Sequence, residues 1–264
     1  MLTVFLTLAL GSSQLGASRT ALATVTDVRG RTIVDVDADD FVVRETGQVR
    51  DVLSVRVADY PIAIVFDNGP GVGRDFVAIR DAISRFVNRV GHRPVAVALA
   101  DTGLPIATFD DDRSAVARAL DRIRPSASGD GLFQAIVVSA RAVAESGSAF
   151  SAIVVVSASP AAGLPAELLT PILESGAAVH VVSGGGQAAG RAGETLRALA
   201  DQTHGQFTTV YSAASYQVAL DRLADRLAPQ LMVEYVVPVG SSGSNDVQLG
   251  VRIPGARVIG LGVK

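Results

Sequence analysis

The spacing of hydrophobic residues changes twice along the chain, and the changes mark three regions. From Ala23 to Val57 short runs alternate apolar and polar residues, which is typical of β-strands with one exposed face. From Tyr60 to Gln230 continuous apolar runs alternate with stretches that repeat an apolar residue every three or four positions, as amphipathic helices do. After Gln230 the strand pattern returns. We therefore expect an α/β body at 60–230 between two β-rich flanks, 23–57 and 231–264.

The body is predicted to be a doubly wound, mostly parallel sheet. Predicted strands and helices alternate, and right-handed crossovers would place the helices on both faces of the sheet. Asp101-Thr102-Gly103 separates two short strands, which indicates an antiparallel hairpin at one edge. The predicted strands are 62–66, 94–100, 105–109, 152–156, 178–182 and 206–210, and the predicted helices are 74–90, 113–124, 131–145, 166–174, 193–203 and 216–227.

Strand patterns in the two flanks predict a smaller β unit. Before the body, the short runs are separated by turns at Arg29-Gly30 and Thr46-Gly47. After the body, strands are predicted at 231–239 and 246–259, with Gly240–Ser244 as the turn. The simplest packing joins the two flanks into one unit built from both termini.

The first residues have the pattern of an export signal. Residues 1–17 form an apolar block followed by small residues suitable for cleavage, and the block is short for a membrane span. No basic residue precedes Arg19, so a buried first strand or helix is the alternative interpretation. A signal peptide at 1–17 would make the mature protein periplasmic or secreted, with no membrane span after its removal.

Composition excludes several classes of function. The 264 residues are 48% hydrophobic and 19% charged, which is typical of a globular protein. A net charge of -3 argues against nucleic acid as a partner, because such binders need clustered positive charge. The absence of cysteine removes disulfides, thiol nucleophiles and thiolate metal sites. The three histidines are scattered, without the spacing of metal ligands.

Element order and short motifs support a more specific interpretation. A hairpin after the second strand of the body and two successive helices before regular alternation make the order similar to the von Willebrand factor type A (VWA) fold, which is Rossmann-like. Val25–Gly30, Asp40–Gly47 and Val233–Tyr235 resemble segments of the VWFA-related family of exported bacterial proteins. The resemblance covers most of the chain, from about Ala23 to Gly260.

The resemblance implies a place for a metal. In metal-binding members an Asp-x-Ser-x-Ser loop, a threonine and a further aspartate hold Mg²⁺ in a metal-ion-dependent adhesion site (MIDAS). Here the first loop is Asp67-Asn68-Gly69-Pro70-Gly71, in which the aspartate matches and glycines replace both serines. Asp130 stands at the threonine position, and the third loop, Ser157–Pro160, has no carboxylate. Two interpretations stay open: the site is lost, or Asp67 and Asp130 hold Mg²⁺ or Ca²⁺ weakly.

The function implied by the resemblance is noncatalytic protein-protein interaction, and we expect it to need no metal or other cofactor. Open α/β sheets bind ligands at the carboxyl ends of their strands, so the loops there are expected to contact another protein, which the sequence does not identify. No residue is predicted to be catalytic. The expected contact residues are Asn68, Gly69, Gly71, Ser128, Asp130, Ser157 and Ser159.

A small-molecule or nucleotide-binding α/β enzyme is the alternative function. It would use Asp67 and the Gly184–Gly190 loop, which follows a predicted strand and precedes a predicted helix as phosphate-binding loops do. The glycine spacing of this loop differs from the dinucleotide-binding motif, so a flexible loop is the competing interpretation. His180 falls in the middle of a predicted strand and is expected to be a core or edge residue with satisfied hydrogen bonds.

Overall fold

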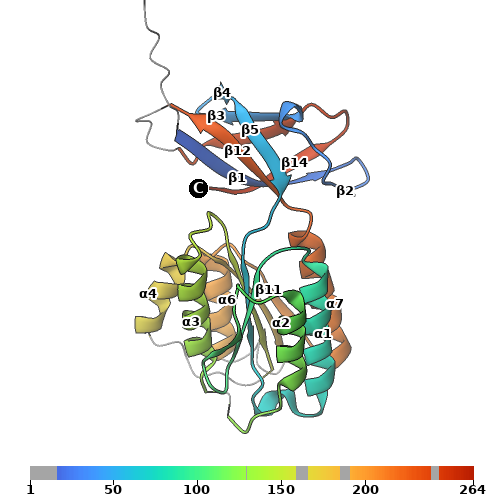
Figure 1. Cartoon of the computed structure of the whole chain (residues 1–264), viewed down its shortest axis with the longest axis vertical. Helices are drawn as coiled ribbons and strands as arrows, with labels where there is room; N and C mark the ends of the chain where they lie inside the picture. The colour runs from blue at the N-terminus through green and yellow to red at the C-terminus, as the bar shows by residue number, and fades with distance from the viewer. Residues whose placement is uncertain (1–16, 129, 159–165, 185–190, 239–243) are drawn as a thin grey trace, which may run out of the picture. The chain divides into compact units, whose positions relative to one another are not determined.

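The structure is a computed structural model, which describes residues 17–128, 130–158, 166–184, 191–238 and 244–264 (Figure 1). The predicted signal peptide lies outside these ranges except for Ala17. The chain divides into two compact units: an α/β unit of residues 57–230, and a β unit that combines residues up to Arg56 with residues 231–264. Within the described ranges, no helix has both the length and the hydropathy that crossing a bilayer requires.

The α/β unit is built on a six-stranded sheet in the order β11-β10-β9-β6-β7-β8. Neighbouring strands are parallel, except that β8 runs antiparallel to β7. The chain therefore has a mixed α/β fold, as predicted. The strands are β6 (Ile62–Phe66), β7 (Val95–Leu99), β8 (Pro105–Ala107), β9 (Ala152–Ser157), β10 (Ala178–Gly184) and β11 (Phe207–Val210).

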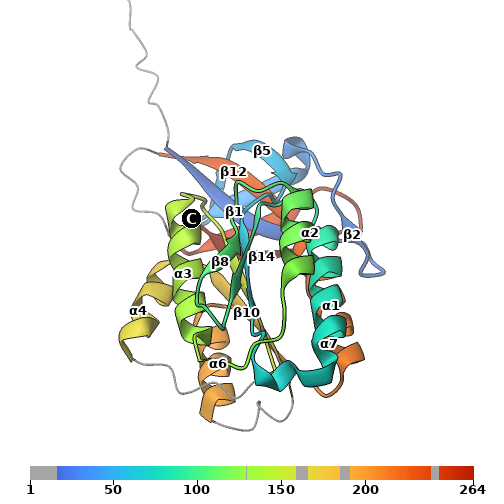
Figure 2. The same cartoon turned by 60° about the horizontal axis from the view of Figure 1, so that its bottom comes forward.

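Helices cover both faces of this sheet. In two views of the unit, α3, α4 and α6 lie on one face and α1, α2 and α7 on the other (Figure 1 and Figure 2). A 3-10 helix, η2 (Pro70–Asp75), precedes the first of them. The helices are α1 (Phe76–Arg89), α2 (Arg113–Arg122), α3 (Leu132–Glu145), α4 (Ala166–Glu174), α6 (Arg191–Gln202) and α7 (Ala213–Leu227).

Apolar stripes on the helices meet a sheet that is buried on both sides. In α1 the buried residues Phe76, Ile79, Ile83 and Phe86 repeat every three or four positions, so they lie on one face of the helix. On the other face of the sheet, α3 packs against β6, β7 and β9. This two-sided packing accounts for the continuous apolar runs in the strands.

Two predicted elements differ in the structure. Arg74 and Asp75, at the start of the predicted helix 74–90, belong to the 3-10 helix η2, and the α-helix begins at Phe76. The predicted strand 246–259 is two strands, β13 (Val247–Val251) and β14 (Arg257–Val263), because the chain turns at Pro254-Gly255, where the glycine has φ 76.

The β unit packs two sheets around its own core. One sheet has the order β14-β1-β12-β5, with β2 paired to β1, and the other has the order β13-β3-β4. Segments from both ends of the chain pair directly: β1 lies antiparallel to β12 from Ala17↔Val237 to Ala23↔Leu231. The remaining elements are β1 (Ala17–Thr26), β2 (Thr32–Ile33), the 3-10 helix η1 (Ala38–Asp40), β3 (Phe41–Glu45), β4 (Gln48–Arg50), β5 (Val52–Val57) and β12 (Leu231–Val237).

An ion triad lies between the strands of the β unit. Glu45, at the end of β3, is 2% exposed. Its Oε1 accepts a hydrogen bond from Arg19 at 2.6 Å, and its Oε2 accepts one from Arg50 at 3.2 Å. Arg19 also donates to the carbonyl of Ser244 at 2.8 Å. The triad therefore ties β1, β3 and β4 to the segment that precedes β13.

We expect Glu45→Ala to destabilise the β unit. The change leaves two arginines without their carboxylate, and breaking a buried ion pair costs about 3 kcal/mol. Denaturant unfolding measures the difference. Asp35→Asn changes an exposed carboxylate of the same unit and should shift the free energy of unfolding by less than about 0.5 kcal/mol. Equal small effects from both variants would contradict the stabilising role of the triad.

His180 is a buried titratable residue of the α/β unit. It lies on β10, between β9 and β11, and is 7% exposed. Its Nδ1 has no hydrogen-bond partner among the described residues, so the expectation of satisfied hydrogen bonds is wrong for this atom. Burial, with a contribution from the charge of Arg226, lowers the pKa of the imidazole to about 3. At neutral pH His180 is therefore an uncharged core side chain.

Acid is expected to weaken the α/β unit through His180. The unfolded chain protonates this residue below its ordinary pKa of 6.5, whereas the folded protein resists protonation down to about 3. The stability that His180 contributes is therefore complete above about pH 6.5 and is lost as the pH falls toward 3, by at most about 1.4 kcal/mol per pH unit.

Urea unfolding at a series of pH values between these two limits measures the slope. His180→Phe should flatten the pH dependence of the free energy of unfolding, whatever its effect on absolute stability. His204→Gln, which changes an exposed histidine, is the matched control and should leave the slope unchanged. The same slope in all three proteins would refute this assignment.

Candidate functional site

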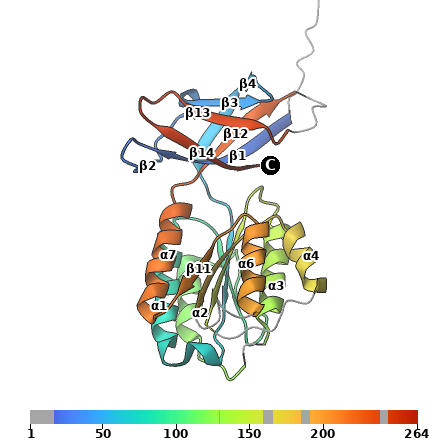
Figure 3. The same ribbon diagram turned by 180° about the vertical axis from the view of Figure 1, so that it is seen from behind.

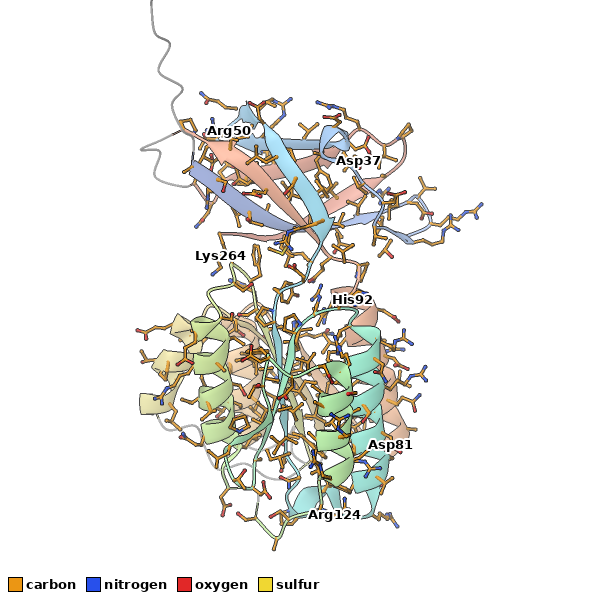
Figure 4. All side chains as sticks on the ribbon, viewed as in Figure 1. Asp37, Arg50, Asp81, His92, Arg124 and Lys264 are labelled. Carbon is orange, nitrogen blue, oxygen red and sulfur yellow. The ribbon has the colours of Figure 1, made fainter. Side chains whose placement is uncertain are left out.

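The loops after β6, β7 and β9 meet at one end of the α/β unit, the end that carries Arg124 in Figure 4. We define the loop edge as residues 67–73, 100–104, 124–128, 130–131 and 157–158. Backbone hydrogen bonds join its segments: Ser126 N–H donates to the Asn68 carbonyl at 2.8 Å, and Gly131 N–H donates to the Ala100 carbonyl at 2.9 Å. The carboxyl ends of parallel strands bring these loops together.

Asp67 is the most buried charged residue of the loop edge, at 1% exposed. Its Oδ1 accepts a hydrogen bond from Gly69 N–H at 3.1 Å. Its Oδ2 accepts hydrogen bonds from the Ser157 hydroxyl at 2.9 Å and from Ala158 N–H at 3.2 Å. The carboxylate therefore stabilises the turn of its own loop through Gly69, and it links that loop to the end of β9 through Ser157 and Ala158.

Tyr216 supports the same arrangement from α7. Its hydroxyl donates to the Ser157 carbonyl at 2.9 Å. Burial, together with the negative charges of Asp67 and Asp75, raises the pKa of this hydroxyl, so it stays protonated and keeps donating. In the sequence Tyr216 is one member of the apolar stripe of a helix, and nothing local distinguishes it from a core aromatic residue.

Asn68 makes the second set of contacts. Its side-chain amide donates to the Arg124 carbonyl at 3.1 Å, and its Oδ1 accepts from Asp101 N–H at 3.3 Å. Asn68 is 1% exposed and Ser157 is also 1% exposed. Both side chains are buried and hold the loops in place, and their contact with a partner stays a prediction.

The other predicted contact residues are placed differently. Gly71, Ser128 and Asp130 are exposed, whereas Gly69 is buried under the loop. The Ser128 hydroxyl donates to Asp130 Oδ2 at 3.4 Å, so these two side chains lie together on one loop. Ser159 lies outside the described residues. The exposed residues among these predicted contacts thus come from the loop after β6 and from the loop between α2 and α3.

The described residues do not match the ligand set of a MIDAS. Hard cations need several oxygen ligands, and Gly69 and Gly71 supply no side-chain oxygen. The carboxylate of Asp67 accepts hydrogen bonds from N–H and O–H donors of its own chain. Among the described residues, no three histidine or acidic side chains converge where a metal ion would bind.

A cavity of about 490 Å³ opens beside Asn68. One wall carries Asp101, whose Oδ1 is buried without a hydrogen-bond partner among the described residues. Sequence reasoning treated Asp101 as a turn residue, although its position directly after a strand is the same signal that selects Asp67. The cavity is lined by Asn68, Leu99, Asp101, Ile106, Ala119, Arg122, Ile123, Arg124, Pro125 and Ser126.

The glycine loop proposed for an enzyme falls mostly outside the described residues. Gly184 ends β10, and residues 185–190 are not described. At Gly184 a side chain would come within 3.0 Å of the Tyr216 hydroxyl, so close packing at the end of β10 suits a glycine there. This packing is a structural explanation for Gly184 that requires no phosphate ligand.

Comparisons with known proteins bear on the fold. No protein-family model matches the chain, and no curated protein matches it. A von Willebrand factor type A structure from Catenulispora acidiphila matches with a TM-score of 0.52 at 12% identity, covering 98% of this chain and 75% of that one. The vWF domain of the type V pili tip protein Mfa5 from Porphyromonas gingivalis matches with a TM-score of 0.54 at 11% identity, covering 64% of this chain and 95% of that one.

A third similar structure comes from an animal. Proximal thread matrix protein 1 from the mussel byssus matches with a TM-score of 0.54 at 13% identity, covering 66% of this chain. The match covers 49% of the mussel chain, so this chain spans about half of that length. Identities this low carry information about the fold alone. This chain has the von Willebrand factor type A fold, as the order of its elements predicted.

We expect Asp67→Ala to destabilise the protein in the presence of a chelator. The change leaves buried N–H and O–H donors without their acceptor, which costs about 2 kcal/mol. Denaturant unfolding in EDTA measures the loss. Asp130→Ala alters the other candidate metal ligand, which is exposed, and should change the free energy of unfolding by less than about 0.5 kcal/mol. A gain in stability for Asp67→Ala would contradict the structural role of this carboxylate.

Proposed function

We propose that this chain is a noncatalytic interaction module that binds another protein through its loop edge, and that it does so without a metal. Solved structures of the same fold include the tip protein of a bacterial pilus, which makes an interaction role reasonable for this chain. The exposed residues that would meet the partner are Pro70, Gly71, Ser128 and Asp130. The cavity beside Asn68 offers a concave surface next to them.

The contacts of Asp67 carry the metal-independent part of the proposal. In a metal site this carboxylate would be a ligand, directly or through water. Here it accepts hydrogen bonds from Gly69, Ser157 and Ala158. The N–H and O–H groups of the chain itself therefore stabilise the negative charge of the carboxylate. These hydrogen bonds give the loops a fixed conformation that needs no cation.

Export is a further part of the proposal. Residues 1–17 have the apolar pattern and the small residues of a cleavable signal, and β1 starts where that segment ends. A periplasmic or secreted location also agrees with the likeness to a pili tip protein. The net charge of -3 argues against nucleic acid as the partner.

The enzyme alternative lacks a supporting observation among the described residues. Gly69 N–H, Ala158 N–H and the Ser157 hydroxyl donate to Asp67, and none of these three groups is a general base that would activate a nucleophile. We therefore favour binding over catalysis.

The proposal is tested by capture of a partner from an envelope extract of the native organism, in millimolar EDTA and again in millimolar Mg²⁺. We expect the same protein to be retained in both buffers, because no metal is needed to form the surface. Asp130→Arg, on the loop edge, should reduce the retained amount at least tenfold through steric and charge mismatch. Asp81→Arg, on α1, is the matched control and should retain it fully, since Asp81 is exposed and lies outside the loop edge.

Two outcomes separate the parts of the proposal. Capture that occurs in Mg²⁺ and disappears in EDTA would overturn metal independence while leaving the loop edge as the binding surface. Capture that survives Asp130→Arg would overturn the loop edge. Circular dichroism of both variants confirms that they are folded before the comparison is made.

A further inference from the structure

A second surface of the α/β unit has the features of a strand-binding edge. β11 is the last strand of the sheet and pairs only with β10. Val181 N–H donates to the Gln206 carbonyl at 2.7 Å, and Val181 is in register with Phe207. In a parallel ladder alternate residues direct both backbone groups toward the neighbouring strand, so Phe207 and Thr209 direct their N–H and C=O groups outward.

These outward backbone groups are accessible. Neither Phe207 nor Thr209 makes an outward hydrogen bond within the described residues, and both side chains are partly exposed. Figure 3 shows β11 at the margin of the sheet, with α7 on one side and α6 on the other. Tyr211 follows the strand directly and is 84% exposed. Two donors, two acceptors and an exposed aromatic ring therefore line one short edge.

A groove of about 350 Å³ runs between this strand and α7. Thr208 and Val210 line it from the strand, and Val218 and Arg222 line it from the helix. Val218 is 50% exposed, which leaves an apolar surface in the groove for a side chain of an added strand. In strand addition the main chain pairs with the edge while alternate side chains enter such a groove.

Positive charge flanks the edge on both sides. On α7, Arg222 and Arg226 follow Val218 at intervals of four residues, so the three share one face of the helix. Arg222 makes no ion pair with a described residue, and Arg226 donates to the Gln206 amide rather than to a carboxylate. On α6, the guanidinium of Arg197 lies 4.3 Å from the centroid of the Phe207 ring.

The acidic residues of α7 do not neutralise this charge. Asp221 and Asp225 face the other way, toward α1, where they pair with Arg85 and Arg89. The two flanks of α7 therefore differ: one is an ion-paired seam with α1, and the other presents arginines without carboxylate partners beside an open strand.

We propose that β11 binds an extended, acidic segment of another protein by strand addition. The segment pairs its backbone with the outward groups of Phe207 and Thr209, and its carboxylates meet Arg197 and Arg222. A competing explanation is that the arginines protect the edge against pairing, as charged residues on edge strands commonly do. The two explanations differ in one measurable respect, because a protective edge rejects every added strand.

The experiment titrates the isotope-labelled full chain with a blocked peptide that alternates valine and glutamate, followed by nuclear magnetic resonance. We expect saturable shifts of the backbone amides of Phe207 and Thr209, and slower hydrogen exchange at both, because their N–H groups enter new hydrogen bonds. The same peptide with lysine in place of glutamate should bind at least tenfold more weakly. Salt should weaken the binding of the acidic peptide.

Two variants make the result specific. Arg222→Glu should weaken binding of the acidic peptide at least tenfold, whereas Arg141→Glu, an exposed arginine on α3 away from this edge, should leave it within twofold. Thermal unfolding checks that both variants are folded. The proposal is overturned by absence of binding at millimolar peptide, by equal binding of the lysine peptide, or by shifts that avoid Phe207 and Thr209. None of these results bears on the loop edge, which belongs to other strands.

Discussion

Burial of β6 on both sides is the constraint from which the α/β unit follows. All five residues from Ile62 to Phe66 are buried, and the strand pairs in parallel with β7 on one side and β9 on the other. A strand in that position needs helices over both faces, and parallel neighbours need crossover connections to provide them. The same arrangement puts the ends of β6, β7 and β9 at one edge of the sheet. Asp67 is the first residue after β6, so its buried place at the start of the loop is a direct result of the strand's position.

The two proposed surfaces, the loop edge and the edge of β11, would bind by different physical means. At the loop edge, side chains such as Asp67 and Asn68 use their hydrogen bonds internally, and the outer surface consists of small or polar residues on a fixed scaffold. At β11 the side chains contribute less, because the groups that can still form hydrogen bonds are the outward backbone N–H and C=O groups of the strand. A rigid surface favours recognition of a preformed shape, whereas an open strand selects extended chain with little regard for its exact sequence. One unit thus offers two kinds of recognition.

The sequence predicted the fold well because the fold depends on local periodicity and element order. Five-residue apolar runs identified the central strands, and two successive helices after a hairpin identified the VWA order. What could not be predicted depends on contacts between distant residues. Burial of Asn68 and Ser157 results from hydrogen bonds between separate loops, and the unpaired Nδ1 of His180 depends on what surrounds β10. The 3-10 turn at Arg74 and Asp75 was not predicted, because apolar residues repeating every three or four positions do not distinguish a 3-10 turn from the first turn of an α-helix. Whether the loop edge meets a metal or a partner stays a prediction.

The way the β unit is closed has a consequence for synthesis of the protein. β1 is an interior strand of its sheet, and one of its neighbours, β12, starts only after the entire α/β unit has been made. The ends of the α/β unit lie side by side, since Ala58 N–H donates to the Gln230 carbonyl at 2.7 Å. The α/β unit is therefore inserted into the β unit, and we expect it to fold as soon as it leaves the ribosome. Until β12 and β14 are made, β1 lacks these two neighbouring strands. Completion of the β unit thus requires that translation has passed β14 and that the inserted unit has brought its two ends together.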